Sequence, residues 1–262
     1  MDIQIRPMTK SDIDTVIRVI YSIDEDDAEY ARECYNERGI DGDFVMINQG
    51  LIIGVVGFTY EEGTDATFWL SWTYLLEEYH GQGLGRKMLD FIIDEVKNIG
   101  GRKMFISMSD YRDPEDGRVY DSAKKLYAAA GFTEEARLQD YYNFNESQTI
   151  LGMRLNNNVS SDIVDSSEDG IKLTRIFEID ETEDSYCIDW KPSGRKIFSD
   201  KDLDKMVKKA TGKGAKRIFI SFPSVFPEAI QSVNYYGFYQ VGKLQDFYED
   251  GVHEMQFGLP VY

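Results

Sequence analysis

Hydrophobic and polar positions along the chain predict an alternation of strands and helices. Apolar, β-branched runs bounded by turn residues indicate strands, and apolar residues that recur every three to four positions indicate amphipathic helices. Strands are expected at about 3–6, 43–48, 51–60, 66–76, 103–108, 137–144 and 149–155, and helices at about 13–20, 26–37, 84–96 and 123–130. Neighbouring strands joined by short turns such as Gln49-Gly50 favour an α/β (α+β) fold with a mixed, mostly antiparallel central sheet flanked by helices.

The second half of the chain partly repeats the first. GFTEEARLQDYY, which begins at Gly131, matches GFYQVGKLQDFY, which begins at Gly237, at an offset of 106 residues. Upstream, GGRKMFIS from Gly100 matches GAKRIFIS from Gly214 at an offset of 114, so the first half carries eight additional residues between the two matches. The matched order and spacing favour a duplication over a chance likeness of two strand–helix units.

A stretch rich in Asn, Ser, Asp and Gly separates the two halves. It covers residues 156–170 and has no helical period, which is typical of a linker. We therefore expect a larger domain at 1–155 and a second, smaller domain at 171–262.

The composition narrows the range of partners. The 262 residues include 47 Asp and Glu against 29 Lys and Arg, a formal net charge of −18. This acid excess argues against binding to nucleic acid or to an anionic membrane surface. Cys34, Cys187 and two histidines are too few and too scattered for a disulfide scaffold or a zinc site, so no metal is expected. The absence of a signal-like or membrane-length apolar run predicts a cytoplasmic protein.

A glycine-rich stretch opens the helix expected at 84–96. His80-Gly81-Gln82-Gly83-Leu84-Gly85 is followed by Arg86 and Lys87. Such a strand–turn–helix junction directs free backbone N–H groups and the positive end of the helix dipole to one point, so it predicts a phosphate site. A dinucleotide fingerprint from Gly81 would need glycine where Arg86 stands, and the Lys-Ser/Thr pair of a Walker A motif is missing. The spacing thus excludes both nucleotide motifs.

This stretch resembles the acyl-CoA loop of the GNAT (Gcn5-related N-acetyltransferase) superfamily. The family pattern is Arg or Gln, two residues, Gly, one residue, then Gly or Ala, and His80 stands in the place of the first residue. The opening IQIRPMTKSDID and the later Ala123, Leu126-Tyr127 and Gly131-Phe132 also resemble the family, over residues 1 to about 155. The resemblance implies a GNAT fold and an N-acetyltransferase that moves an acetyl group from acetyl-CoA to a primary amine by direct attack.

The resemblance also assigns roles to residues. Tyr127 matches the family's general acid, and a phenol with a pKa of about 10 keeps its proton at pH 7. Backbone N–H groups of the glycine stretch would hold the CoA pyrophosphate, and the preceding strand end would lie beside the pantetheine, in a V-shaped opening against the strand at 103–108. The residues expected at the cofactor are Tyr74, Leu75, Leu76, His80, Gly81, Gln82, Gly83, Leu84, Gly85, Arg86 and Lys87.

The general base and the acceptor are left open by the sequence. Carboxylates near the strand ends are Glu61, Glu62, Asp65, Glu77 and Glu78, and a water relay through Ser71 or Thr73 is an equal alternative. The eight additional residues lie where the family often builds its acceptor site, and they bring in Tyr111, Arg112, Asp113, Glu115 and Asp116. With the acidic total, this segment suggests a cationic amine acceptor, either a small molecule or a protein.

The second half departs from the family pattern. Its counterpart of the glycine stretch, DWKPSGRKIFSDKDL, contains Gly194 alone, and Val233 occupies the position of Tyr127. We therefore expect a degenerate GNAT-like domain without cofactor chemistry, which packs against the first half, completes a shared sheet or acceptor cleft, or forms a homodimer. The alternative to catalysis is a non-catalytic acyl-CoA-binding or regulatory module.

Overall fold

The computed structural model describes residues 2–112, 120–156, 170–194 and 196–261. The helices are α1 Ile13–Tyr21, α2 Glu25–Arg38, α3 Leu84–Asn98, α4 Asp121–Ala130, α5 Asp200–Thr211 and α6 Pro227–Tyr236, with short 3₁₀ helices η1 Lys10–Asp12 and η2 Glu77–Tyr79. The strands of the first half are β1 Ile3–Pro7, β2 Asp43–Asn48, β3 Leu51–Tyr60, β4 Thr67–Leu70, β5 Tyr74–Leu75, β6 Lys103–Ser109, β7 Thr133–Asn143 and β8 Glu146–Arg154. The strands of the second half are β9 Ile171–Glu178, β10 Ser185–Pro192, β11 Arg217–Pro223, β12 Tyr239–Glu249 and β13 Val252–Pro260.

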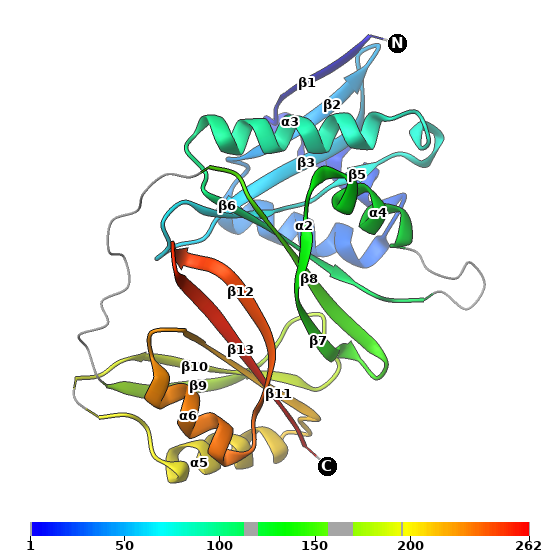
Figure 1. Ribbon diagram of the computed structural model, residues 1–262. Coiled ribbons are helices and arrows are strands. Elements are labelled where there is room, and N and C mark those ends of the chain that lie inside the picture. Colours follow the sequence, from blue (N-terminus) through cyan, green and yellow to red (C-terminus); the bar gives the residue numbers. More distant parts are fainter. Residues whose placement is uncertain (1, 113–119, 157–169, 195, 262) are drawn as a thin grey trace.

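The sheet is mixed and mostly antiparallel, as the sequence predicts, and the strands of both halves belong to it, which is one of the alternatives left open for the second half. Its pairs are antiparallel except β4 with β6 and β10 with β11, which are parallel. In Figure 1, β7, β8, β12 and β13 cross the middle of the molecule, between the part that carries α1 to α4 and the part that carries α5 and α6.

The alternating side chains of the first half's strands explain its layers. In β2, Met46 joins the core under α3 and α4, whereas its neighbour Val45 joins the core under α1 and α2. In β3, Val56 and Val55 divide between the same two cores. Because successive side chains of a strand point to opposite faces, α3 and α4 cover one face of the sheet, and α1 and α2 cover the other.

The strand expected at 66–76 is interrupted in the structure. β4 pairs with β6 only as far as Trp69 opposite Phe105, and β5 pairs instead with β3. Between them, the Ser71 N–H donates to Gly57 O at 2.9 Å and the Thr73 hydroxyl donates to Ser71 O at 2.9 Å. The first bond keeps this segment beside β3 and the second is local to it, and the sheet opens between this segment and β6 beyond Trp69.

The strand order is the same when read inward from either side. It runs β3-β4-β6-β8-β7 on one side and β9-β10-β11-β13-β12 on the other, and the two runs meet where β7 pairs with β12. β6 and β11 begin 114 residues apart, at 103 and 217, and β7 and β12 begin 106 apart, at 133 and 239. The element bounds therefore repeat with the offsets found in the sequence.

Side-chain hydrogen bonds between the halves are reciprocal. The buried Thr67 hydroxyl, at the start of β4, donates to Phe247 O at 2.6 Å. The buried Ser185 hydroxyl, at the start of β10, donates to Tyr141 O at 2.6 Å. The two acceptor residues, Tyr141 and Phe247, are 106 residues apart, and the two donors begin the equivalent strands β4 and β10. Each half therefore binds the equivalent residue of the other half.

Backbone hydrogen bonds extend the same reciprocity. The Asp65 N–H donates to Tyr248 O at 2.6 Å, and the Glu183 N–H donates to Tyr142 O at 2.6 Å. Each half thus binds the far end of the other half's long hairpin, β7–β8 or β12–β13, through a backbone hydrogen bond.

The two strand edges touch at a pair of equivalent residues. Ala136 of β7 pairs with Gly242 of β12, 106 residues further along the chain. A Cβ atom added to Gly242 would lie 2.3 Å from the Ala136 Cβ. Only one of the two positions can therefore carry a side chain.

Replacing Gly242 with alanine should destabilise this junction, because overpacking a close contact costs about 1–3 kcal/mol. Removing the opposing methyl group with Ala136→Gly should relieve the clash, so the double variant should show a favourable coupling of about 1 kcal/mol or more in a double-mutant cycle. Guanidinium chloride denaturation of the two single variants and the double variant measures this coupling. Additive effects would contradict the contact.

Candidate functional site

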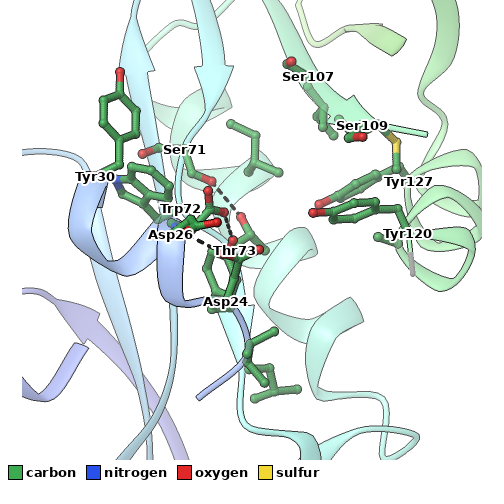
Figure 2. Close-up of a pocket in the computed structure, with 18 of the residues that line it drawn as sticks. Asp24, Asp26, Tyr30, Ser71, Trp72, Thr73, Ser107, Ser109, Tyr120 and Tyr127 are labelled. Carbon is green, nitrogen blue, oxygen red and sulfur yellow. Dashed lines mark hydrogen bonds between the residues drawn. The ribbon is translucent and has the colours of Figure 1, made fainter. Parts of the chain in front are cut away.

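A cleft of about 1350 Å³ lies where the chain leaves β6, between β4 and β5. Its walls come from α2, the bent segment between β4 and β5, the glycine turn, β6, and α4 with the residue before it. In Figure 2, Tyr120 and Tyr127 point from one wall toward Thr73 and Asp24 on the other. The interrupted strand thus creates the V-shaped opening that the sequence resemblance implies.

Backbone conformation explains two of the glycines in the turn. Gly81 and Gly83 have φ angles of 70° and 77°, in the left-handed region that other residues enter only with strain. No atom lies within 4 Å of the Cβ that either would carry, so the space beside them is open to a ligand. Gly83 directly precedes α3, whose first N–H groups have no acceptor within the helix. Lys87 N–H is already bound to Gly83 O at 3.1 Å, so the free donors precede Lys87.

The two cations after the turn are engaged elsewhere. Arg86 Nε lies 2.7 Å from Asp90 Oδ1, one helical turn further on, and Arg86 also donates to Ala129 O at 3.0 Å. Lys87 Nζ donates to Ile3 O at 3.3 Å. Backbone N–H groups, rather than these two side chains, are therefore the donors that the turn presents to the cleft.

Some of the residues predicted to contact the cofactor line the cleft, and others lie outside its lining. The lining includes Tyr74, Leu75, His80, Gly81 and Gly85. Among the described residues, the lining does not include Leu76, Gln82, Gly83, Leu84, Arg86 or Lys87. The Leu84 side chain belongs to the core under α3, and the Gln82 amide donates to Glu78 O at 2.9 Å.

His80 is held by the strand that precedes it. Its Nε2 lies 2.8 Å from Leu75 O, and because a carbonyl oxygen only accepts, Nε2 carries the proton. The bond links the glycine turn to the end of β5. His80 therefore fixes the turn to the strand at the mouth of the opening.

Tyr127 lies at the inner wall of the cleft. It is 8% exposed, and its ring packs against Phe132 with a centroid distance of 6.2 Å. Within the described part of the chain, no hydrogen-bonding partner lies at its hydroxyl. Burial raises the pKa of Tyr127 to about 12, so the phenol stays protonated near neutral pH. A protonated, unpartnered hydroxyl in a cleft is suited to donate to a bound molecule.

The opposite wall is acidic, which the sequence analysis did not predict. Asp24 caps α2 by accepting from the Asp27 N–H at 3.0 Å, and the Tyr74 hydroxyl donates to the Asp27 carboxylate. Burial raises the pKa of Asp27. The sequence predicts only a helix at about 26–37 here, because the position of these carboxylates over the cleft depends on the packing of α2 against α1 and β3.

Of the residues that the sequence offers for taking the amine proton, the two relay residues lie in the cleft. Ser71 and Thr73 line the cleft. Within the described residues, the lining does not include Glu61, Glu62, Asp65, Glu77 or Glu78. Tyr111 and Arg112 line a neighbouring hollow of about 140 Å³. Asp113, Glu115 and Asp116 lie outside the described residues.

The equivalent opening of the second half is filled. β10 also pairs with β11 over only three residues, up to Cys187 opposite Phe219. Beyond them, Trp190 Nε1 donates to Ser221 O at 2.6 Å, and the Trp190 ring packs on Phe222 at a centroid distance of 5.6 Å. Val233, at the position equivalent to Tyr127, is fully buried. The counterparts of Trp190 and Ser221 in the first half, Trp72 and Ser107, line the cleft instead.

Two further features of the described residues bear on the class of site. They contain no group of three or more His, Cys, Asp or Glu side chains placed to hold a metal ion. None of their helices has the length and apolar character needed to cross a membrane.

The fold and the cleft agree with the comparison to known families. Residues 41–134, which include β2 to β6, the glycine turn and α4, match the family model described as acetyltransferase (GNAT) domain. This part of the chain is thus similar to a GNAT acetyltransferase domain. It has no significant match among curated proteins.

Solved structures share the fold of the first half. A GNAT-family protein from Desulfovibrio desulfuricans has 23% identity and a TM-score of 0.53, over 59% of this chain and 99% of that one. Ard1 from Thermoplasma volcanium has 16% identity and a TM-score of 0.50, over 60% of this chain and all of that one (100%). An aminoglycoside 6′-N-acetyltransferase complexed with coenzyme A has 12% identity and a TM-score of 0.50, over 61% and 100%.

The phenol of Tyr127 should not ionise below pH 11, since burial raises its pKa to about 12. NMR of protein labelled at the tyrosine Cζ carbon measures this titration, with the Tyr127→Phe variant to assign the signal. A midpoint near the ordinary value of about 10 would show that the hydroxyl is hydrated rather than buried.

Proposed function

We propose that this protein is an N-acetyltransferase that moves an acetyl group from acetyl-CoA to a primary amine. The observation that carries the proposal is the convergence, in one cleft, of the free N–H groups of the glycine turn, the bent end of β5 and the unpartnered Tyr127 hydroxyl. A phosphate-binding turn, an exposed strand end and a proton donor are the three parts that a direct transfer from a thioester needs.

The residues present fit acetyl-CoA as co-substrate. The open backbone of Gly81 and Gly83 and the N-terminus of α3 suit a pyrophosphate group. The end of β5 faces the opening and suits the amides of the pantetheine. The similar aminoglycoside 6′-N-acetyltransferase is complexed with coenzyme A, which supports the same assignment here.

In the reaction, the amine nitrogen bonds to the acetyl carbon while the C–S bond of acetyl-CoA breaks and its electron pair stays on sulfur. The nitrogen loses one proton and the sulfur gains one. Tyr127 donates the proton to sulfur, since its phenol is protonated and unpartnered. The amine proton leaves toward the wall that carries Asp27, through water held by Ser71 and Thr73.

We infer that the chain consists of a catalytic domain at 1–155 and a degenerate GNAT-like domain at 171–262, joined by a linker at 156–170. The repeated strand order and offsets support this division. The second domain has Trp190 and Val233 where the first has its open cleft and Tyr127, which supports a role in packing and in completing the sheet rather than in acyl transfer.

Release of free thiol from acetyl-CoA, followed with a panel of primary amines, tests the function. Turnover that requires both the amine and the protein supports it. Saturable binding of CoA without turnover of any amine would instead identify a non-catalytic acyl-CoA-binding module.

Replacing Tyr127 with phenylalanine should lower kcat about 100-fold, because general acid catalysis contributes a factor of that order or more. The KM for acetyl-CoA should change little, since the ring and its contact with Phe132 are kept. Tyr236→Phe, in α6 of the second half, serves as the control and should keep full activity. An unchanged rate for the Tyr127 variant at every pH would remove the acid assignment.

Replacing Gly83 with alanine should weaken CoA binding about tenfold, because alanine disfavours the φ of 77° by about 1–2 kcal/mol and the turn would shift. Gly50→Ala is a matched control: its φ is 81°, its Cβ would also meet no atom within 4 Å, and it lies in the β2–β3 turn. Calorimetric titration with CoA should show a loss for Gly83→Ala alone. Equal affinities of the two variants would place the pyrophosphate elsewhere.

A further inference from the structure

One residue of the second half lines the cleft of the first. Glu181 lies in the turn between β9 and β10 and is exposed to the cleft. The Glu183 N–H holds this turn against Tyr142 O at 2.6 Å, and Tyr142 also lines the cleft. The reciprocal contact between the halves therefore delivers a carboxylate of the second half to the candidate site.

The turn that carries Glu181 has a counterpart in the first half. Thr182 Oγ1 donates to Ile179 O at 2.7 Å, and Thr64 Oγ1, at the equivalent position, donates to Glu61 O at 2.7 Å. Glu181 has a φ of 58°, and its counterpart Gly63 has a φ of 75°. The left-handed conformation favours glycine. Glu181 is therefore more strained in this conformation than Gly63 is at the equivalent position of the first half.

The surroundings of Glu181 are negative. Asp24, Asp26 and Asp27 of α2 and Glu146 of β8 line the same cleft. Partial burial and, after it, the charges of Asp27 and Asp24 together raise the pKa of Glu181 to about 7. Among the described residues of the lining, Arg38 is the one Lys or Arg, and its guanidinium is bound by Asp43 at 2.9 Å. The protein thus leaves these carboxylates without a cation of its own.

Two independent features indicate that a molecule occupies this cleft. Tyr127 is more than nine-tenths buried, and its unpartnered hydroxyl faces the interior of the cleft. On the acidic side, Tyr30 and Trp72 line the wall and meet edge to face at a centroid distance of 5.8 Å. Aromatic faces beside carboxylates are suited to an ammonium group.

We propose that Glu181, together with Asp24 and Asp27, binds a second ammonium group of a di- or polyamine acceptor, so that the second half of the chain determines acceptor selectivity. This inference rests on the proposed N-acetyltransferase function. One amine of the acceptor, in its neutral form, reacts at the thioester, and the distant amine stays protonated in the acidic part of the cleft. A monoamine of the same length has only the reacting amine and places no ammonium group in the acidic part of the cleft.

The test compares 1,4-diaminobutane and spermidine with 1-aminobutane, which lacks the second ammonium group, in the thiol-release assay. The wild-type protein should prefer the diamine in kcat/KM by about tenfold or more, the effect of one favourable charge interaction. Glu181→Gln keeps the shape of the side chain and removes its charge. It should raise the KM for both polyamines about tenfold and leave the KM for acetyl-CoA and the rate with 1-aminobutane unchanged.

Glu183→Gln is the matched control. It removes one charge from the same turn, but Glu183 is not among the described residues that line the cleft, so polyamine selectivity should be kept. Glu181→Gly is a second variant, because glycine suits the φ of 58°. It should melt at the same or a higher temperature than the wild type and still lose the selectivity, which separates the effect from misfolding.

Equal selectivity of wild type and Glu181→Gln, or equal losses in Glu181→Gln and Glu183→Gln, would overturn the proposal. If the wild type releases no thiol with any amine, the proposed function fails, and calorimetric titration with spermidine then tests the cation site alone. Binding that weakens about tenfold in Glu181→Gln but not in Glu183→Gln would support the site. Identical binding by all three proteins would refute it.

Discussion

The structure depends on the pairing of two sheet edges at β7 and β12. An exposed strand edge is a row of unsatisfied N–H and C=O groups, and here the edge of each half is covered by the other, with Ala136 opposite Gly242 at the centre. The hydroxyls of Thr67 and Ser185 satisfy the carbonyls at the far ends of the hairpins. Both donors are fully buried, and the Phe247 carbonyl also accepts from the Arg102 guanidinium at 3.3 Å, so buried hydrogen bonds hold the two halves in a single arrangement.

That arrangement also sets the composition of the site. The long β7–β8 hairpin reaches beyond its own half, and the same segment that binds the turn at 179–185 contributes Tyr142 and Glu146 to the cleft. The site is therefore assembled from two parts with separate origins. The glycine turn, β5 and Tyr127 come from contiguous segments of the first half, and the acidic part comes from α2 and from Glu181 of the second half.

The parts that the sequence predicts are those encoded locally. The glycine turn and the helix expected at 84–96 follow from residue spacing, and the helix is observed at Leu84–Asn98. The offsets of 106 and 114 locate the equivalent strands β6 and β11, and β7 and β12, to the residue. The break in the strand expected at 66–76 was not predicted, because apolar and polar residues go on alternating through Ser71 and Thr73, as in a strand, and this pattern hides the local bond of Thr73 to Ser71 O. The acidic wall was not predicted either, because it joins α2 to a turn more than 140 residues away, and no local pattern encodes that contact.

In both halves the strands of the parallel pair, β4 and β6 or β10 and β11, diverge, but different side chains lie in the resulting opening. In both, the parallel pair ends after three residues, which leaves a wedge in the sheet. In the second half Trp190 fills the wedge, donates to Ser221 O and packs on Phe222, so apolar burial stabilises that half on its own. In the first half the equivalent Trp72 turns to Tyr30 and leaves the wedge open. An open wedge lacks that burial, and a neighbouring domain without a site of its own can supply the missing stability through the shared sheet. The second half is then the neighbour that borders the open cleft, and Glu181 is its residue in the lining.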